Sequence, residues 1–407
     1  MSRLLRLLLP VALFSACAPR DGGQAAPRPA RYLYVWAGTS HHTEAGTNFI
    51  AVIDVDSSSA TYGQVLTTTT AGTGMMPHHA EYILPVGHPF FANDFMTGRT
   101  VLIDASTPTS PRLVDTVDRT PGFHQLHSLL RLADTLVVAT LQFGDSSLPG
   151  NPGGLAEFNA AGRLLRTASS ADSSLPGARI RTYGLVLLPA IDRALSTSSP
   201  MDSERTANVI QIWRLSDLSL LHTTAMPGIA GDSVEHYPFE ARALADGRTV
   251  FLNTYTCGFY RITDLDRSEP RVELVYSMRE PRRYGCSVPV VAGRFWVMPI
   301  AYSHVVVTLD LADPSHPVEV SRLPTDTTFF PHWLAADPGS DRLVVTEQGD
   351  GLPRVMMLHL DRSTGRLSWD ELFKEADSTA HGVSFTRAGW PNGVTGPAMP
   401  HAALFVP

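Results

Sequence analysis

Two adjacent histidines, His78 and His79, stand in the stretch "MMPHHAEY" at 75 to 82. They lie between a proline and a glutamate in a chain in which only 17% of the residues are charged. An ordinary surface loop has no need of such a pair, whereas imidazole nitrogens are frequent ligands of copper, zinc and iron. The pair therefore suggests a metal site, provided that the fold brings further ligands to it.

The chain is built of repeated units that are typical of an all-β protein. Glycine and proline number 31 each, and β-branched runs end again and again in aspartate or asparagine. Seven such runs recur, at 49–56, 99–106, 153–160, 209–217, 258–266, 305–313 and 355–361. Their spacing of roughly 45 to 60 residues allows about four strands per unit, which predicts a seven-bladed β-propeller over residues 31–407.

The two ends of the chain are expected to complete one blade together. The segment "PHAALF" at 400–405 resembles the first strand of a unit that has no other strands. The segments "YLYVWAG" at 32–38 and "FIAVIDVD" at 49–56 resemble later strands of a unit that lacks its first strand. Pairing them would close the ring and remove two open sheet edges.

The innermost strand of each blade is expected to begin at the mouth of a central channel. The residues at this position in the seven units are His78 or His79, His127, a glycine near Gly184, Glu240, Gly285 or Cys286, His332 and His401. A single histidine there would ordinarily be a hydrogen-bonded channel residue. Several converging imidazoles are different, because without a cation they leave buried nitrogens unsatisfied and repel one another when protonated. We therefore predict a metal bound by His78, His79, His127, His332 and His401, and the residue types leave copper, zinc and iron open.

Two carboxylates are placed to assist this site. Glu240 and Glu81 could orient an imidazole or transfer a proton, and for Glu81 a simple ion pair at the rim is an equal alternative. The pair His41 and His42 lies in a Gly/Thr-rich loop and is expected at the surface or the channel rim. The remaining histidines are expected at the surface, except for His124 and His236, which lie close to the start of an inner strand.

The N-terminal segment predicts export. Residues 1–17 have a basic start and an apolar run that is too short to span a bilayer. The ending "FSAC" resembles a lipobox that would lipidate Cys17, although Phe14 departs from the usual leucine and ordinary signal cleavage is the alternative. Residues 18–30 are expected to be a flexible tether. The protein would then be periplasmic and lipid-anchored to the outer membrane, with no other membrane contact.

The net charge and the cysteine content limit the possible partners and the redox state of the protein. A formal net charge of −7 without a basic tract excludes a nucleic-acid partner. Besides Cys17 the chain has only Cys257 and Cys286, which would either form one disulfide in an oxidising compartment or stay buried as thiols. The sequence does not indicate an oligomeric state.

Several segments resemble the selenium-binding protein family, which includes the methanethiol oxidases. The similarity is greatest over "NFIAVIDVDSSSATYGQVLTTTTAGTGMMPHHAEY" at 48–82. Shorter stretches, "HQLHSLL", "RTYGLVLLPAIDRALSTSSP", "PFEARAL" and the terminal "PHAALF", extend it over most of the chain. Gly63 stands where members often carry a cysteine, so selenium carriage there is not expected, and His332 has no counterpart.

The resemblance implies a seven-bladed propeller with a copper cofactor held by His78, His79, His127 and His401. It also implies the oxidation of methanethiol by O2 and water to formaldehyde, hydrogen sulfide and hydrogen peroxide. The expected partners are therefore a small thiol and O2. One alternative is a propeller that hydrolyses lactones without a metal, although no Gly-x-Ser-x-Gly elbow is present. Another is a lipid-anchored propeller that binds a metal or a protein partner without turnover.

Overall fold

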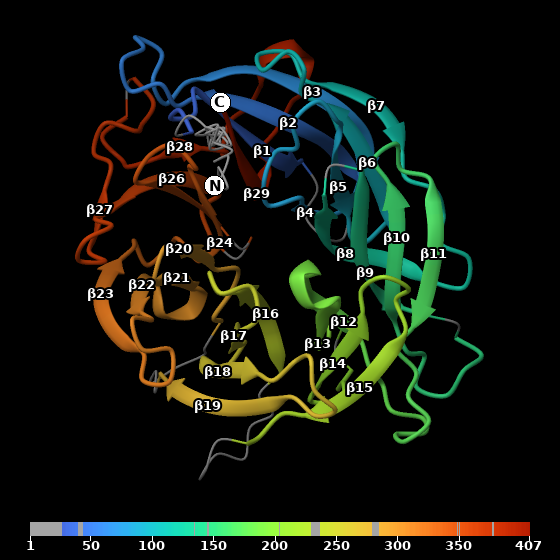
Figure 1. Cartoon of the computed structure of the whole chain (residues 1–407). Helices are drawn as coiled ribbons and strands as arrows, with labels where there is room; N and C mark the ends of the chain where they lie inside the picture. Colours follow the sequence, from blue (N-terminus) through green and yellow to red (C-terminus); the bar gives the residue numbers. More distant parts are fainter. Residues whose placement is uncertain are drawn as a thin grey trace, which may run out of the picture.

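The chain forms a ring of seven antiparallel sheets, as Figure 1 shows. The computed structural model describes residues 27–39, 44–133, 135–144, 146–202, 204–228, 237–278, 285–347, 349, 351–376 and 378–407. The predicted signal peptide with Cys17, most of the predicted tether, the pair His41 and His42, and His236 lie outside these residues. Within the described residues no helix is long and apolar enough to cross a membrane.

The first blade combines both ends of the chain, as predicted. Its strands, from the channel outward, are β29 (Met399–Val406), β1 (Tyr32–Gly38), β2 (Gly46–Asp54) and β3 (Val65–Gly74). β1 pairs with β2 on one side and with β29 on the other, so that Tyr32 lies opposite both Asp54 and Val406. This pairing closes the ring and covers the inner edge of β1 with β29.

Each of the other six blades uses consecutive strands, the first of which is innermost. Blade two contains β4 (Pro77–Ala80), β5 (Phe90–Asp94), β6 (Arg99–Asp104) and β7 (Arg112–Thr116). Blade three contains β8 (His124–Leu132), β9 (Leu136–Phe143), β10 (Gly154–Asn159) and β11 (Leu164–Ser169). Blade four contains β12 (Thr182–Leu188), β13 (Arg193–Ser198), β14 (Val209–Arg214) and β15 (Leu220–Ala225), with the short 3-10 helix η1 (Pro189–Ile191) between the first two.

The last three blades repeat this plan. Blade five contains β16 (Pro238–Ala243), β17 (Val250–Thr254), β18 (Gly258–Thr263) and β19 (Arg271–Ser277). Blade six contains β20 (Val290–Ala292), β21 (Phe295–Ile300), β22 (Val305–Asp310) and β23 (Val318–Pro324), with η2 (Ala301–Ser303). Blade seven contains β24 (Pro331–Ala336), β25 (Arg342–Glu347), β26 (Arg354–Leu360) and β27 (Leu367–Trp369), and β28 (Val383–Ser384) pairs with β26, ahead of η3 (Pro391–Gly393).

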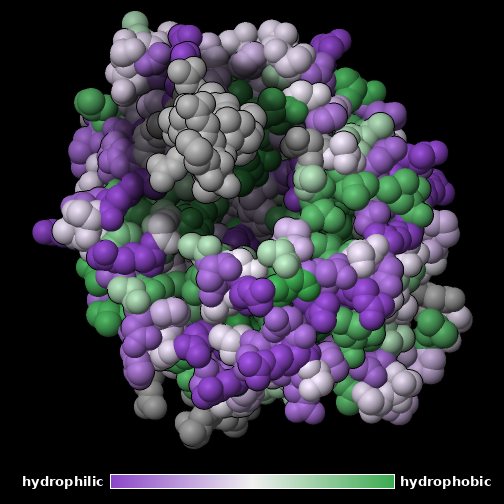
Figure 2. Space-filling view, in the orientation of Figure 1, coloured by the Kyte–Doolittle hydropathy of each residue, from purple (hydrophilic) through white to green (hydrophobic). Residues whose placement is uncertain are grey.

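The hydrophobic core lies between neighbouring blades and not within one central cluster. The middle strands have both faces covered, so they read as continuous apolar runs, as β22 does with its sequence VVVTLD. Phe91 of blade two packs against Phe158 of blade three, and Phe251 of blade five packs against Trp296 of blade six. The outermost strands are mostly half-buried, and β7 is exposed along its whole length. Figure 2 shows the same face of the ring hollowed at its centre, with apolar residues gathered around the hollow.

The N-terminal segment joins the ring one residue earlier than expected. Ala30, the last residue of the predicted tether, is buried, and its N–H donates to the carboxylate of Asp337. Arg342 donates to the carbonyl oxygens of Ala30 and Val55 and pairs with Asp337 at 2.7 Å. Ala30 is therefore part of the propeller and not of a flexible tether.

Candidate metal centre

A β-bulge recurs near the start of the inner strands and changes the direction in which the first side chains point. The register between the first and second strands shifts at Pro77/Ala80, Leu126/Leu129, Thr182/Leu185, Pro238/Glu240 and Pro331/Leu334, and between β1 and β29 it shifts beside His401. A bulge lets two successive side chains leave the usual up-and-down alternation of a strand. It explains how His78 and His79, which are neighbours in sequence, can share one site.

The five histidines predicted as ligands lie together at this end of the channel. The ring centroids of His79 and His127 are 4.1 Å apart, and those of His78 and His401 are 4.3 Å apart. His332 joins the group through His401, at 4.7 Å. Nitrogen atoms of His78, His79 and His127 lie within 4.8 Å of one another, close enough for a shared ion. The structure thus brings together all five histidines that the comparison of the blades selected.

Buried imidazole nitrogens in this cluster lack hydrogen-bond partners. Within the part of the chain that the structure describes, no partner contacts Nδ1 of His78, either nitrogen of His79, Nε2 of His127 or Nδ1 of His332. An unpaired buried polar atom is costly, so such a concentration needs a reason. Because one nitrogen of each neutral imidazole carries an available lone pair, a cation that accepts nitrogen ligands would satisfy that nitrogen in each ring.

Four of the clustered histidines, His78, His79, His127 and His332, are neutral at ordinary pH. Burial lowers the pKa of His127 to about 3 and that of His332 to about 4. Burial, followed by the neighbouring imidazoles, lowers the pKa values of His78 and His79 well below their usual range. Only neutral imidazole binds a metal, so the cluster is ready for ligation without losing protons. The residues therefore fit a copper, zinc or iron ion.

Glu81 is held in an ion pair away from the histidines. Arg131 donates to both of its carboxylate oxygens, at 2.8 and 2.7 Å, and the N–H of Phe91 donates to Oε1 at 3.1 Å. Burial raises the pKa of Glu81, and the arginine opposes this shift. The contacts agree with the ion-pair alternative for this residue.

Glu240 does not contact the imidazoles directly but bonds to Tyr82, a neighbour of His79. Arg242 donates to its Oε2 at 2.7 Å, and the hydroxyl of Tyr82 donates to the same atom at 3.2 Å. Its Oε1 is buried, and among the described residues it has no partner. Burial raises the pKa of Glu240, opposed by Arg242. Neither Glu240 nor Glu81 makes a direct hydrogen bond to an imidazole in the described structure, and Tyr82 lies between Glu240 and the ring of His79 as a hydrogen-bond partner of the carboxylate.

Aromatic residues that the sequence analysis missed form the surroundings of the cluster. Tyr183 contacts His127, with 3.7 Å between ring centroids, and Trp333 meets His79 edge-on at 5.0 Å. The comparison of the blades selected Gly184 in blade four, one residue beyond Tyr183. The bulge explains the error, because it makes two consecutive residues candidates for the inward position.

Two further sequence expectations can be compared with the structure. Gly63 has a φ of +77°, and a Cβ there would lie 2.5 Å from the carbonyl oxygen of Lys374. A side chain at that position would therefore be strained and would meet the backbone of Lys374. Cys257 and Cys286, whose state the sequence left open, form a disulfide between neighbouring blades, with 5.3 Å between Cα atoms.

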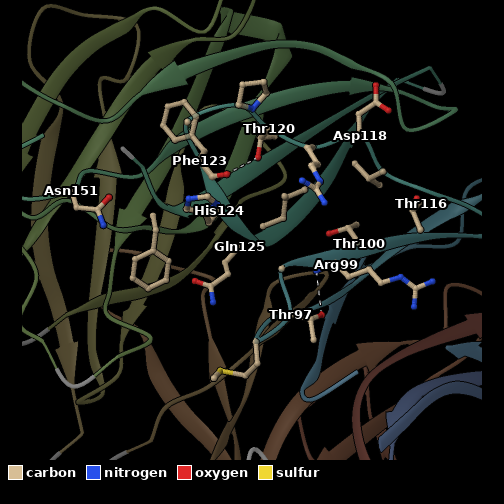
Figure 3. A pocket seen from close by; sticks show the side chains of 18 residues that line it. Thr97, Arg99, Thr100, Thr116, Asp118, Thr120, Phe123, His124, Gln125 and Asn151 are labelled. Carbon is tan, nitrogen blue, oxygen red and sulfur yellow. Dashed lines mark hydrogen bonds between the residues drawn. The ribbon is translucent and has the colours of Figure 1, made fainter. Parts of the chain in front are cut away.

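A cavity of about 1020 Å³ lies between blades two and three, away from the histidine cluster (Figure 3). Residues 96–100, 116–126, Phe143 and Asn151 line it. His124, which the sequence left ambiguous, is exposed and lines this cavity. None of the five clustered histidines lines it, so the two sites are separate.

The fold and the cluster define a seven-bladed β-propeller with a histidine site at the mouth of its channel. No protein-family model and no curated protein sequence matches the chain. A hypothetical selenium-binding protein from Sulfolobus tokodaii has a similar structure, with a TM-score of 0.72, 15% identity, and coverage of 92% of this chain and 93% of that one. The periplasmic gluconolactonase of Pseudomonas aeruginosa is also similar, with a TM-score of 0.65 and 14% identity, and the match covers 92% of this chain and 99% of that one. A protein from Lactobacillus plantarum has a TM-score of 0.62 and 14% identity, and the match covers 92% of this chain and 100% of that one. These likenesses show a shared fold.

Proposed function

We propose that the histidine cluster binds copper and that the protein oxidises a small thiol with O2, as expected from the resemblance to the selenium-binding protein family. The observation that carries this proposal is the set of buried, unpartnered nitrogens on His78, His79 and His127 within the described chain. The likeness to the Sulfolobus structure supports it at the level of the fold. His332 and His401 complete the nitrogen ligand set.

The proposed reaction is RCH2SH + O2 + H2O → RCHO + H2S + H2O2. The carbon that bears sulfur loses two electrons, which reduce O2 to H2O2, and water supplies the oxygen of the aldehyde. A bound copper ion would supply a Lewis acid for the thiol and an electron acceptor. The aromatic rings around the cluster would exclude bulk water, and the free Oε1 of Glu240 is a buried atom able to accept a proton.

Hydrolysis of a lactone is the second candidate, favoured by the similarity to the Pseudomonas gluconolactonase. It needs a general base beside the substrate. Of the two carboxylates expected near the channel, Glu81 has both oxygens engaged with Arg131, whereas Glu240 pairs with Arg242 through Oε2 and keeps Oε1 free among the described residues, so Glu240 is the base that a lactonase would use. Lactonase activity that survives a chelator would favour hydrolysis, and copper binding without oxygen uptake would favour a binding protein.

We also propose a lipid anchor at Cys17, as expected from the sequence of the N-terminal segment. Ala30 contacts Asp337, which directly follows β24, whereas His332 lies at the start of that strand. Five residues of strand separate them, a distance of roughly 16 Å at about 3.3 Å per residue. We infer that an anchored, periplasmic protein would keep its histidine-bearing face directed away from the membrane.

Elemental analysis of protein purified without a metal-chelating tag tests the proposal. We expect about one copper per chain, lost in the double variant His78→Ala/His79→Ala and retained in His304→Ala, which changes a histidine outside the cluster. Thiol-dependent uptake of O2 and formation of H2O2 should disappear together with the copper. Full activity of metal-free protein would overturn the proposal.

A further inference from the structure

A cavity of about 490 Å³ opens directly over the histidine cluster. His78, His332 and His401 lie on its lining. Its walls are mainly aromatic and sulfur-bearing, with Tyr183, Phe239, Tyr255, Tyr302, Met76 and Met201. Cavities of about 300–1,000 Å³ hold drug-sized ligands. The volume is thus far greater than a thiol with one carbon can fill.

One wall of this cavity is a continuous row of rings that leads away from the cluster. The ring of Tyr183 contacts His127 at 3.7 Å, Phe239 contacts Tyr183 at 4.3 Å, and Tyr255 contacts Phe239 at 5.4 Å. Aromatic faces and edges at such spacings favour a further ring in contact with them. Methionine sulfurs on the lining add favourable contacts with an aromatic ligand.

The lining also limits the charge of a ligand. Asp202 is the one acidic or basic side chain besides the histidines among the described lining residues, and it is exposed. No lysine or arginine of the described chain lines the cavity to neutralise a carboxylate on the ligand. A thiol with a carboxylate would lose hydration without gaining a partner.

We propose that the substrate is a neutral thiol with an aromatic ring on the carbon that bears sulfur, and not a one-carbon thiol. This inference rests on the proposed function, since that function directs the sulfur to the histidine cluster. With the sulfur at the cluster, the ring would lie against the row formed by Tyr183, Phe239 and Tyr255. The balanced reaction becomes ArCH2SH + O2 + H2O → ArCHO + H2S + H2O2: the C–S bond and one C–H bond break, and two electrons pass to O2.

Binding measurements with three thiols test this proposal directly. Copper-loaded protein is titrated without oxygen with phenylmethanethiol, methanethiol and mercaptoacetate, and binding is followed by tyrosine and tryptophan fluorescence. We expect phenylmethanethiol to bind at least 10-fold more tightly than either of the others. In Phe239→Ala its affinity should fall about 5-fold to 10-fold, and Phe239→Leu, which keeps most of the volume, should show a similar loss.

The outcomes separate this proposal from the proposed function. Equal or tighter binding of methanethiol or mercaptoacetate would overturn the aromatic substrate, even if copper is bound and methanethiol is oxidised. If the protein binds no copper, the oxidase proposal fails, and the same titration of the metal-free protein still decides whether the cavity prefers the aromatic thiol. An unchanged preference in both Phe239 variants would also overturn the inference.

Discussion

The phenol ring of Tyr82 stacks on the indole of Trp333, with 4.9 Å between ring centroids and 7° between the planes. The indole in turn meets the imidazole of His79 edge-on, at 5.0 Å and 77°. Tyr82 also contacts a positive charge, because the guanidinium of Arg242 lies 4.3 Å from the centroid of its ring. The stack therefore connects the buried pair of Glu240 and Arg242 with His79 and fixes the orientation of that imidazole.

Replacing Trp333 with leucine should weaken metal binding as well as stability. Loss of a group that orients a metal ligand typically costs about 10-fold to 100-fold in affinity, so we expect a fall near the lower end of that range. Trp213 is an equally buried tryptophan in blade four and gives a matched control. Both variants should be less stable, whereas Trp213→Leu should keep its affinity for copper, as measured by competition with a chelator.

The individual histidines should contribute unequally. His78, His79 and His127 bring their nitrogens within 4.8 Å of one another, whereas His332 reaches the group through His401. We expect His127→Ala to lose on the order of 100-fold or more in copper affinity and His332→Ala about 10-fold, by comparison with the effects of neighbouring groups on metal sites. Equal losses in these two variants would contradict this order and show that His332 contributes as much to metal binding as His127.

Much of the fold and of the histidine cluster follows from the sequence, because repeated strand endings fix the number of blades and the position of each inner strand. His127, His332 and His401 are found in this way, although they lie far apart in the chain. Tyr183 and Trp333 are not, since the bulges decide which of two neighbouring residues faces the channel. The partner of Glu81 was equally hidden, because Arg131 lies on the next blade and ordinary strand spacing does not indicate it.

The disulfide between Cys257 and Cys286 should stabilise the ring. Its loop spans 29 residues, and the entropy of closing such a loop in the unfolded chain corresponds to about 3–4 kcal/mol. We expect Cys257→Ser/Cys286→Ser to lower the free energy of unfolding by about this amount in urea denaturation. Wild-type protein under reducing conditions should show a comparable loss, and equal stability of oxidised and reduced protein would contradict the prediction.

The ion pair of Glu81 and Arg131 should matter for stability and not for metal binding. Glu81 is buried and both of its oxygens accept hydrogen bonds from Arg131. Removing one partner of a buried pair typically costs about 3–5 kcal/mol, so Glu81→Gln should reduce the free energy of unfolding by somewhat less than this. Copper content should be unchanged at low temperature, and a loss of thiol oxidation in folded, copper-loaded Glu81→Gln would instead support a catalytic role.

His359 should make the stability of blade seven depend on pH. Its Nδ1 and Nε2 lie 3.2 Å from Asp341 and 3.3 Å from Asp370. The hydrogen bond with Asp370 is the main reason why its pKa is raised above the usual value. The protonated form is thus favoured by folding, so the stabilisation is complete below the unfolded pKa of about 6.5 and is lost as the pH rises through the folded pKa. His359→Gln should be destabilised more at pH 5.5 than at pH 8.5, and Asp370→Asn should reduce this difference between the two pH values. The same loss of stability at both pH values would show that His359 contributes by packing alone.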